Sequence, residues 1–427
     1  MSTPGADTER ASAFRSLRHR NARLFFGGLL VSNVGTWLQM TAMAILVYRT
    51  TGRATDLGIT VMFQFLPMLV LGAWAGAVAD RVDKLRMAIL TQSALAVQAL
   101  VLGFVDIAGW VSMPVVYVSS LVLGLINAFD NPARRGFVTE LVPKADIGNA
   151  VSLNTAVMTG SRVFGPALAA MLVGPLGTGW CFVLNGLSFA AVLGSLLAMD
   201  RRELYAAVVA PRGGTPVRDA LRTVVQNPSL RVVFVVLVVV STFAFNYNVA
   251  LPKLADLRWG NENLYGWLLA ATSIGSVVGS LATARMRWVS MRWFLANTLL
   301  LGLSALAVAW AHNAGAAFVL VLPMGFGGAG FLASVNSITQ QESPDDMRGR
   351  LMALTAVAFL GSTPIGGPVT GVVGDVVGAE WALGYGALIT IAAVAVSAVV
   401  LARRPATVGA HGAADAALVS PESGRAS

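Results

Sequence analysis

The chain has 427 residues, of which 56% are hydrophobic and only 12% are charged, whereas about 25% of the residues of an ordinary soluble domain are charged. This composition excludes a soluble enzyme and a disordered chain, and it predicts a protein that crosses a lipid bilayer many times. The net charge is +9, which in so apolar a chain we attribute to membrane orientation and not to nucleic-acid binding. One cysteine and three scattered histidines exclude a disulfide framework and predict no metal site.

Twelve apolar runs are each long enough to cross the hydrocarbon core as a helix, which takes about 20 residues. No cleavage site of small residues follows the first run, so we interpret it as a retained helix and not as a signal peptide. The predicted spans are 24–48, 57–79, 87–105, 112–131, 148–173 and 179–199 in the first half, and 231–252, 264–284, 293–311, 316–336, 350–376 and 381–402 in the second.

The basic residues are distributed unequally between the two sides of these runs. Of the 30 Lys and Arg residues, 25 lie in or beside the two tails and every second connection. Because basic residues are enriched on the cytoplasmic side, this bias places both termini in the cytoplasm. Arginine outnumbers lysine 27 to 3, a bias typical of a GC-rich bacterial genome, so we expect a multi-pass protein of the bacterial plasma (inner) membrane.

A segment that contains Pro211, Gly213, Gly214 and Pro216 separates the sixth and seventh runs, and such residues interrupt helices. We therefore predict two bundles joined by a linker and flanked by tails. The parts are a cytoplasmic tail at 1–23, a six-helix bundle at 24–199, a cytoplasmic linker at 200–230, a second six-helix bundle at 231–402 and a disordered cytoplasmic tail at 403–427.

The two halves look like copies of each other. When residues 124–166 are shifted by 201 positions, Gly124 falls on Gly325 and Gly165 falls on Gly366. Parallel repeats of this kind are the plan of many transporters, whose substrate path lies between the repeats. We therefore predict an all-α integral membrane fold of twelve transmembrane helices in two six-helix pseudo-repeats.

The connection after the second run carries a specific motif. It reads Gly76-Ala-Val-Ala-Asp80-Arg81-Val-Asp83-Lys84-Leu-Arg86. This resembles the signature loop of the major facilitator superfamily, in which Gly is followed after three residues by Asp-Arg and then by a basic cluster. Asp83 stands where the family usually has a small residue.

Two further stretches resemble one branch of that superfamily. Asn131-Pro132-Ala-Arg134-Arg135 follows the fourth run, and the Gly165-Pro166 pair lies in the fifth. Both look like the twelve-helix drug-efflux branch that includes macrolide exporters and the enterobactin (siderophore) exporter, and the pair is similar to the helix-5 motif of antiporters.

The resemblance implies a secondary exporter of amphipathic small molecules, either drugs in multidrug resistance or siderophores, that works by alternating access as a proton antiporter. Import of a nutrient or siderophore by the same fold is the alternative. The resemblance further implies a monomer that is not an enzyme, with no catalytic residue and no cofactor.

A glycine-rich stretch, Gly325-Phe-Gly327-Gly-Ala-Gly330, matches a dinucleotide-binding fingerprint. It lies inside an apolar run and opens no βαβ unit, so we attribute it to close helix packing.

The same resemblance assigns a conformational gate to the loop between the second and third runs. In the family fold Asp80 lies near the start of the eleventh run, around Asp345 to Arg350, where it ties the two halves together on the cytoplasmic side and favours the outward-open state. Alternatively, these charges only record membrane orientation. The expected gate residues are Gly76, Asp80, Arg81, Lys84, Arg86 and Glu140.

Arg162 is the one charge that we expect deep inside a span, where an arginine costs about 2.5–3.5 kcal/mol. Such a residue faces a cavity or a partner, so we expect Arg162 in a central cavity; the alternative is a structural role within the fifth run. Polar, aromatic and methionine side chains along other spans suit a large, mostly apolar cargo, or else they bond neighbouring helices. The expected cavity residues are Asn33, Thr36, Gln39, Met40, Gln64, Asn154, Arg162, Phe243, Asn246, Tyr247, Asn248 and Asn336.

We expect no carboxylate at the depth of Arg162. Proton coupling is therefore expected to use Asp56, Asp106, Asp130, Glu140 or the cluster around Asp80.

Overall fold

The computed structural model describes residues 14–205, 217–344 and 347–403, and these residues form helices and turns without a β-strand. Twelve of its segments are long and apolar enough to cross a membrane, as predicted. The α-helices are α1 (Arg20–Thr51), α2 (Ala54–Ala79), α3 (Lys84–Ile107), α4 (Met113–Val138), α5 (Ile147–Leu176), α6 (Thr178–Leu197), α7 (Val217–Gln226), α8 (Pro228–Phe243), α9 (Tyr247–Trp259), α10 (Leu264–Ala284), α11 (Met291–Ala309), α12 (Ala314–Glu342), α13 (Arg348–Val376) and α14 (Ala379–Ala402).

Local sequence signals set several helix ends. The side chain of Asn313 accepts a hydrogen bond from the third residue of α12, and Asp83 does the same for α3, which satisfies backbone donors that no helical carbonyl can reach. The signature loop therefore uses Asp83, where its family has a small residue, as a helix cap. Gly52 and Gly260 follow α1 and α9 with positive φ angles of 64° and 68°, a conformation that favours glycine.

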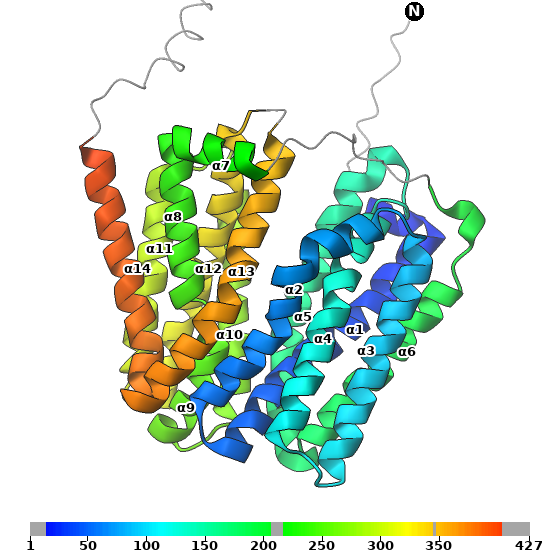
Figure 1. Ribbon diagram of the computed structural model, residues 1–427, viewed down its shortest axis with the longest axis horizontal. Coiled ribbons are helices and arrows are strands. Elements are labelled where there is room, and N and C mark those ends of the chain that lie inside the picture. Colours follow the sequence, from blue (N-terminus) through cyan, green and yellow to red (C-terminus); the bar gives the residue numbers. More distant parts are fainter. Residues whose placement is uncertain (1–13, 206–216, 345–346, 404–427) are drawn as a thin grey trace, which may run out of the picture.

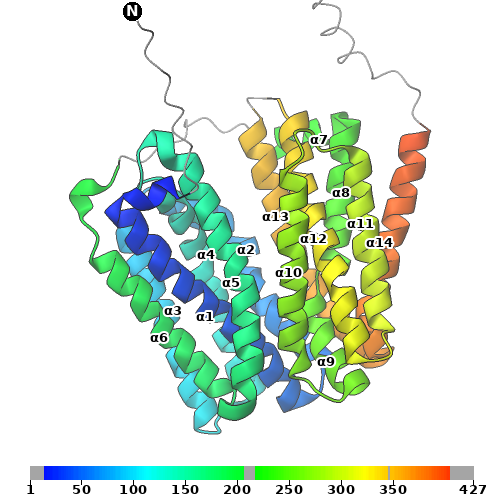
Figure 2. The same cartoon turned by 180° about the vertical axis from the view of Figure 1, so that it is seen from behind.

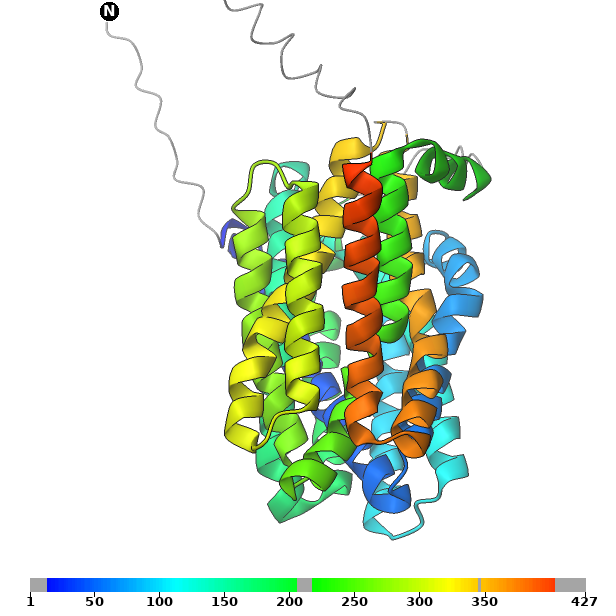
Figure 3. The ribbon, with the colours of Figure 1, turned by 90° about the vertical axis from the view of Figure 1, so that its left-hand side faces the viewer.

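The helices form two bundles that lie side by side, α1–α6 and α8–α14 (Figures 1 and 2). The described chain begins and ends at the same end of both bundles, which we call the terminal face; the other end is the opposite face. Helix α7 lies across the terminal face (Figure 3) and falls within the predicted linker 200–230. The predicted tails, apart from residues 14–23 and Arg403, and the Pro211–Pro216 stretch lie outside the described residues.

Equivalent glycines make equivalent contacts in the two halves. A Cβ atom on Gly124 of α4 would overlap the carbonyl oxygen of Gln64 on α2. A Cβ atom on Gly325 of α12 would overlap the carbonyl oxygen of Thr272 on α10. The fourth span therefore packs on the second, and the tenth on the eighth, through a glycine that lets the two backbones approach, which confirms the predicted pseudo-repeat.

Two details differ from the sequence prediction. The seventh span is broken into α8 and α9 around Phe245, although its apolar run is continuous. Helix α4 does not end at 131 but continues through Pro132 to Val138, so that Asp130 and Arg134 lie inside it. The expectation that Arg162 is the only charge within a span is therefore wrong, because Arg134 can enter the helix as the ion-pair partner of Asp130, four residues earlier.

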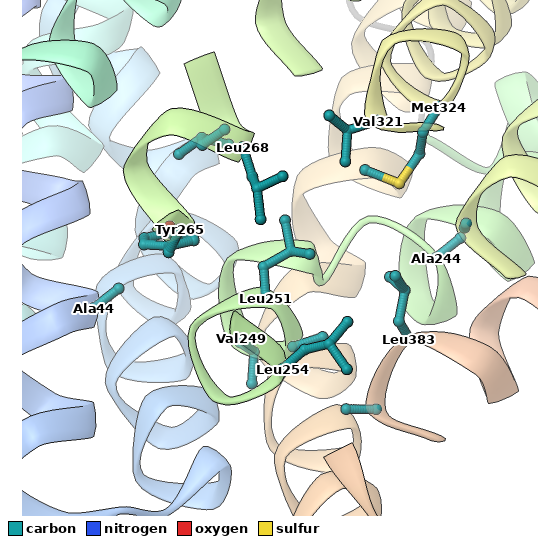
Figure 4. Close-up of a cluster of buried hydrophobic side chains, with 14 of the residues drawn as sticks. Ala44, Ala244, Val249, Leu251, Leu254, Tyr265, Leu268, Val321, Met324 and Leu383 are labelled. Carbon is teal, nitrogen blue, oxygen red and sulfur yellow. The ribbon is translucent and has the colours of Figure 1, made fainter. Parts of the chain in front are cut away.

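One hydrophobic cluster is shared by both halves. Helix α9 inserts Leu251 and Leu254 among α10, α12 and α14, and Tyr265 of α10 faces Ala44 of α1 (Figure 4). Both Tyr265 and Leu251 are at most 1% exposed. The packing of this cluster holds the first half against the second near the opposite face.

Candidate functional site

A cavity of about 180 Å³ lies between the two halves, and we call it the central cavity. Its wall is formed by α1, α2 and α5 of the first half, by α10, α12 and α13 of the second, and by the break between α8 and α9. Its lining includes Trp37, Met40, Met43, Gln64, Phe65, Arg162, Phe245, Asn246, Tyr247, Asn248, Tyr265, Leu332, Phe359 and Thr363.

Arg162 lines the central cavity and remains exposed there. Its guanidinium carbon lies 5.0 Å from the centre of the Trp37 ring, within the range of a cation–π contact. Gly165, one turn further along α5, permits this contact, because a Cβ atom on it would overlap Trp37 and would lie 2.8 Å from the carbonyl oxygen of Val34. Within the described part of the chain, Arg162 has no ion-pair partner. Its charge is therefore presented to whatever occupies the cavity.

The break between α8 and α9 turns several side chains into the central cavity. The amide of Asn246 donates to the carbonyl oxygen of Thr242 (2.6 Å), which satisfies a backbone acceptor at the end of α8. Phe245 packs edge-on against Phe359, with ring centres 5.3 Å apart. Broken helices whose ends line a cavity are a common way to build a binding site inside a membrane protein.

The predicted cavity residues fall into three groups. Six of them line the central cavity: Met40, Gln64, Arg162, Asn246, Tyr247 and Asn248. Asn33, Thr36 and Gln39, together with Met40, line a second, smaller cavity inside the first half. Phe243 packs against Tyr385 of α14 instead, and Asn154 and Asn336 line neither cavity.

The second cavity, which we call the inner polar cavity, has a volume of about 40 Å³. It is enclosed by α1, α3, α4 and α6, and amide side chains dominate its wall. Gln39 is the centre of a chain of hydrogen bonds: it donates to Gln98 (3.2 Å) and accepts from Asn185 (2.7 Å). Gln98 continues the chain to Ser119 (2.7 Å).

Asp375 joins the two halves at the opposite face, and sequence reasoning did not assign it a role. Its carboxylate, on α13, accepts hydrogen bonds from the backbone N–H groups of Ala54 (2.9 Å) and Thr55 (2.8 Å), at the start of α2. It also accepts from the Thr55 hydroxyl (2.6 Å) and pairs with Lys253 of α9 (2.5 Å). A carboxylate from one half thus caps a helix of the other, where the helix dipole favours negative charge.

Further contacts between the halves lie beside Asp375. The Tyr48 hydroxyl donates to Asp256 (2.9 Å), and Arg49 forms an ion pair with Glu262. The backbones of α2 and α13 are also close, because a Cβ atom on Gly58 would lie 2.8 Å from the Cα atom of Pro368. These contacts close the central cavity toward the opposite face. Sequence reasoning counted Arg49 only as an orientation signal and did not assign a role to Asp256 or Glu262.

The predicted gate residues lie at the terminal face. Asp80 and Arg81 are exposed, and neither forms an ion pair with a described residue; Asp345 and Asp346 lie outside the described residues.

The other predicted gate residues contact only the first half or have no close neighbour. Lys84 pairs with Glu140 (2.6 Å), but both residues belong to the first half. Gly76 lies at the end of α2 and has no neighbour within 4 Å of its Cβ position, and Arg86 pairs with the neighbouring Asp83. The gate role of these residues stays a prediction.

Comparisons with known proteins agree with this architecture. Residues 11–417 match the model of a family described as transmembrane secretion effector. The chain is 28% identical over 370 residues to the multidrug efflux pump Tap of Mycolicibacterium fortuitum, which covers 82% of this chain and 88% of that protein. It is 21% identical over 360 residues to the staphyloferrin A transporter of Staphylococcus aureus, with 83% and 90% covered.

A solved structure of a POT family transporter in complex with a thioalcohol-conjugated peptide has the same fold, with a TM-score of 0.71 at 13% identity over 90% of this chain and 96% of that one. The family match spans nearly the whole chain and agrees with the signature loop and with the twelve spans. The chain therefore belongs to the transmembrane secretion effector family of the major facilitator superfamily, and it is a multi-pass membrane transporter and not an enzyme.

Proposed function

We propose that this transporter is a secondary exporter of amphipathic small molecules that works by alternating access and is driven by proton exchange. The observation that carries the proposal is the central cavity, which lies between the halves and is closed toward the opposite face by Asp375 and its neighbours. Rocking of two repeats about such a site exposes it to one side of the membrane at a time.

The lining of the central cavity supports an amphipathic cargo. Aromatic and methionine side chains such as Trp37, Phe245 and Met40 form adaptable apolar walls. Arg162 adds a planar cation with five donors, which matches a carboxylate or sulfonate. We infer that the preferred cargo carries an anionic group at one end. Because cavities for drug-sized ligands measure about 300–1,000 Å³, this cavity of about 180 Å³ widens as the cargo binds.

The direction of transport follows from orientation and relationship. The excess of Lys and Arg at the terminal face supports a cytoplasmic location for that face, so the cavity is closed toward the outside in this conformation. The similarity to a multidrug efflux pump supports export, and the similarity to a staphyloferrin A transporter supports small-molecule cargo. We place the transporter in the bacterial plasma membrane, as a monomer with both termini in the cytoplasm.

The test is transport by the purified protein in liposomes. The probes are taurocholate as an amphipathic anion, erythromycin as a macrolide and ethidium as an amphipathic cation. With an acidic lumen, we expect accumulation of at least one probe, taurocholate first, and loss of accumulation when an ionophore collapses the gradient. Accumulation of no probe, or accumulation only with the gradient reversed, contradicts proton-driven export.

A further inference from the structure

Asp130 is the most deeply buried carboxylate among the described residues. Its side chain is 1% exposed, and it lies in α4 eight residues before Val138, about 12 Å from the terminal end of that helix at 1.5 Å per residue. A charge at this depth is costly, so membrane proteins retain it chiefly on ion and proton pathways.

The other candidate proton carriers are in different settings. Asp56 and Asp106 lie near the opposite face and bond Tyr117 and Thr178. Glu140 lies beyond the end of α4, and Asp80 is exposed at the terminal face. Of the five candidates only Asp130 is buried within the body of a span.

The two carboxylate oxygens of Asp130 have different partners. One carboxylate oxygen accepts from the Thr91 hydroxyl (2.7 Å) and from the Gln92 amide (2.8 Å). The other lies 3.3 Å from the guanidinium of Arg134, without a well-formed hydrogen bond. The oxygen of the Gln92 amide is also buried without a partner. Two unsatisfied oxygens therefore lie in the wall of the inner polar cavity.

The inner polar cavity provides a path for a proton. Its volume of about 40 Å³ exceeds the roughly 10–15 Å³ that one water molecule needs. Asp130 and Arg134 lie in its wall, and Met40 lines both this cavity and the central cavity. The inner polar cavity therefore has room for water between Asp130 and Met40, which borders the cargo site.

Helix α1 links the two cavities mechanically. Arg134 donates to the side chain of Asn33 on α1 (3.4 Å), and Trp37, one turn along the same helix, contacts Arg162 in the central cavity. The same helix thus contacts the charge partner of Asp130 at one position and the cation of the cargo site one turn further on.

We propose that Asp130 is the residue that binds the exchanged proton, with Arg134 as its charge partner and the inner polar cavity as the proton path. One proton binds a carboxylate oxygen and neutralises its charge, and it leaves to water when the transporter faces the cytoplasm. Other charged residues on the elements around Asp130 are Arg135 on α4 and the ion pair of Lys84, at the start of α3, with Glu140, just beyond α4. Neighbouring α2 carries carboxylates only near its two ends, Asp56 and Asp80. This inference rests on the proposed proton-driven export.

The experiment compares the wild type with Asp130→Asn, with the double variant Asp130→Asn/Arg134→Gln, and with Asp106→Asn as a matched control. Each protein is reconstituted and assayed with taurocholate, erythromycin and ethidium in two ways. The first is accumulation driven by one pH unit, which for one proton per cargo reaches about tenfold. The second is exchange of labelled for unlabelled probe without a gradient, which needs no net proton movement.

We expect both Asp130 variants to lose the tenfold accumulation and to keep probe exchange, and we expect Asp106→Asn to keep both activities. Gradient-driven accumulation by Asp130→Asn at the wild-type level overturns the proton assignment and leaves the proposed export intact. Loss of exchange in both Asp130 variants, with folded protein, also overturns it, because Asp130 is then structural. If the wild type itself ignores the gradient, the proposed function fails and this inference fails with it.

Discussion

Replacing Asp375 by Asn tests whether the contacts at the opposite face hold the cavity closed. The substitution removes the charge that caps α2 across the two halves and leaves Lys253, which is 13% exposed, without its partner. The Asn oxygen can still accept a backbone hydrogen bond from α2, but the charge-assisted bonds become neutral ones, which costs about 1 kcal/mol. Loss of the charge at the helix N-terminus adds about 0.3–1 kcal/mol. We expect a total of about 1–2 kcal/mol, so the ratio of closed to open protein at this face should fall by about 5- to 30-fold.

The assay is a distance measurement by electron spin resonance. Cys181, the single cysteine, is replaced by Ser, and spin labels are placed at Ala108 and His312, which are exposed at the opposite face on different halves. Asp375→Asn should move the distance distribution to longer values. Asp106→Asn, which removes a carboxylate bonded to Thr178 within the first half, should not. Equal distributions in Asp375→Asn and the wild type would refute this reasoning.

Three further substitutions test separate parts of the account. Arg162→Gln should raise the KM for taurocholate by about tenfold, the loss of one charge-assisted contact, and should leave ethidium transport unchanged; a similar loss for both probes contradicts an anion-binding role. Gly371→Ala should also lengthen the label distance at the opposite face, because the added methyl group would overlap the carbonyl oxygen of Ala54. An unchanged distance would show that α13 and α2 are not in close backbone contact at this point. Glu140→Gln should lower the free energy of unfolding by about 2 kcal/mol, because Lys84 loses its partner, without any shift in the label distance; a shift in that distance would give Glu140 a role between the halves.

Hydropathy and charge bias predicted the twelve spans because the bilayer requires about 20 apolar residues at each crossing. They did not predict the break in the seventh span, because the run from Val232 to Val240 just before it is uniformly apolar. The available signal was the pair of amides at Asn246 and Asn248, which the sequence reading assigned to the cavity but not to a break.

Charge pairing was harder to predict than span position. The predicted fourth span ends at 131, just before Pro132 and Arg134, yet a membrane helix tolerates a proline, and Arg134 neutralises Asp130 one turn away. The contact of Asp375 with α2 joins residues more than 300 positions apart. No local pattern reports such a contact, and only the packing of α13 on α2 creates it.

Binding of cargo between the halves, in the central cavity, shields the wall of that cavity from reagents in solution. Thr363 lines that cavity and is small enough to be replaced by Cys in the Cys181→Ser background. The measurement is the rate at which a membrane-impermeant maleimide labels Thr363→Cys, with and without the probe that the wild type accumulates. We predict that the probe slows this labelling and leaves labelling of a cysteine at exposed Ala108 unchanged; equal rates at position 363 with and without the probe would contradict the account.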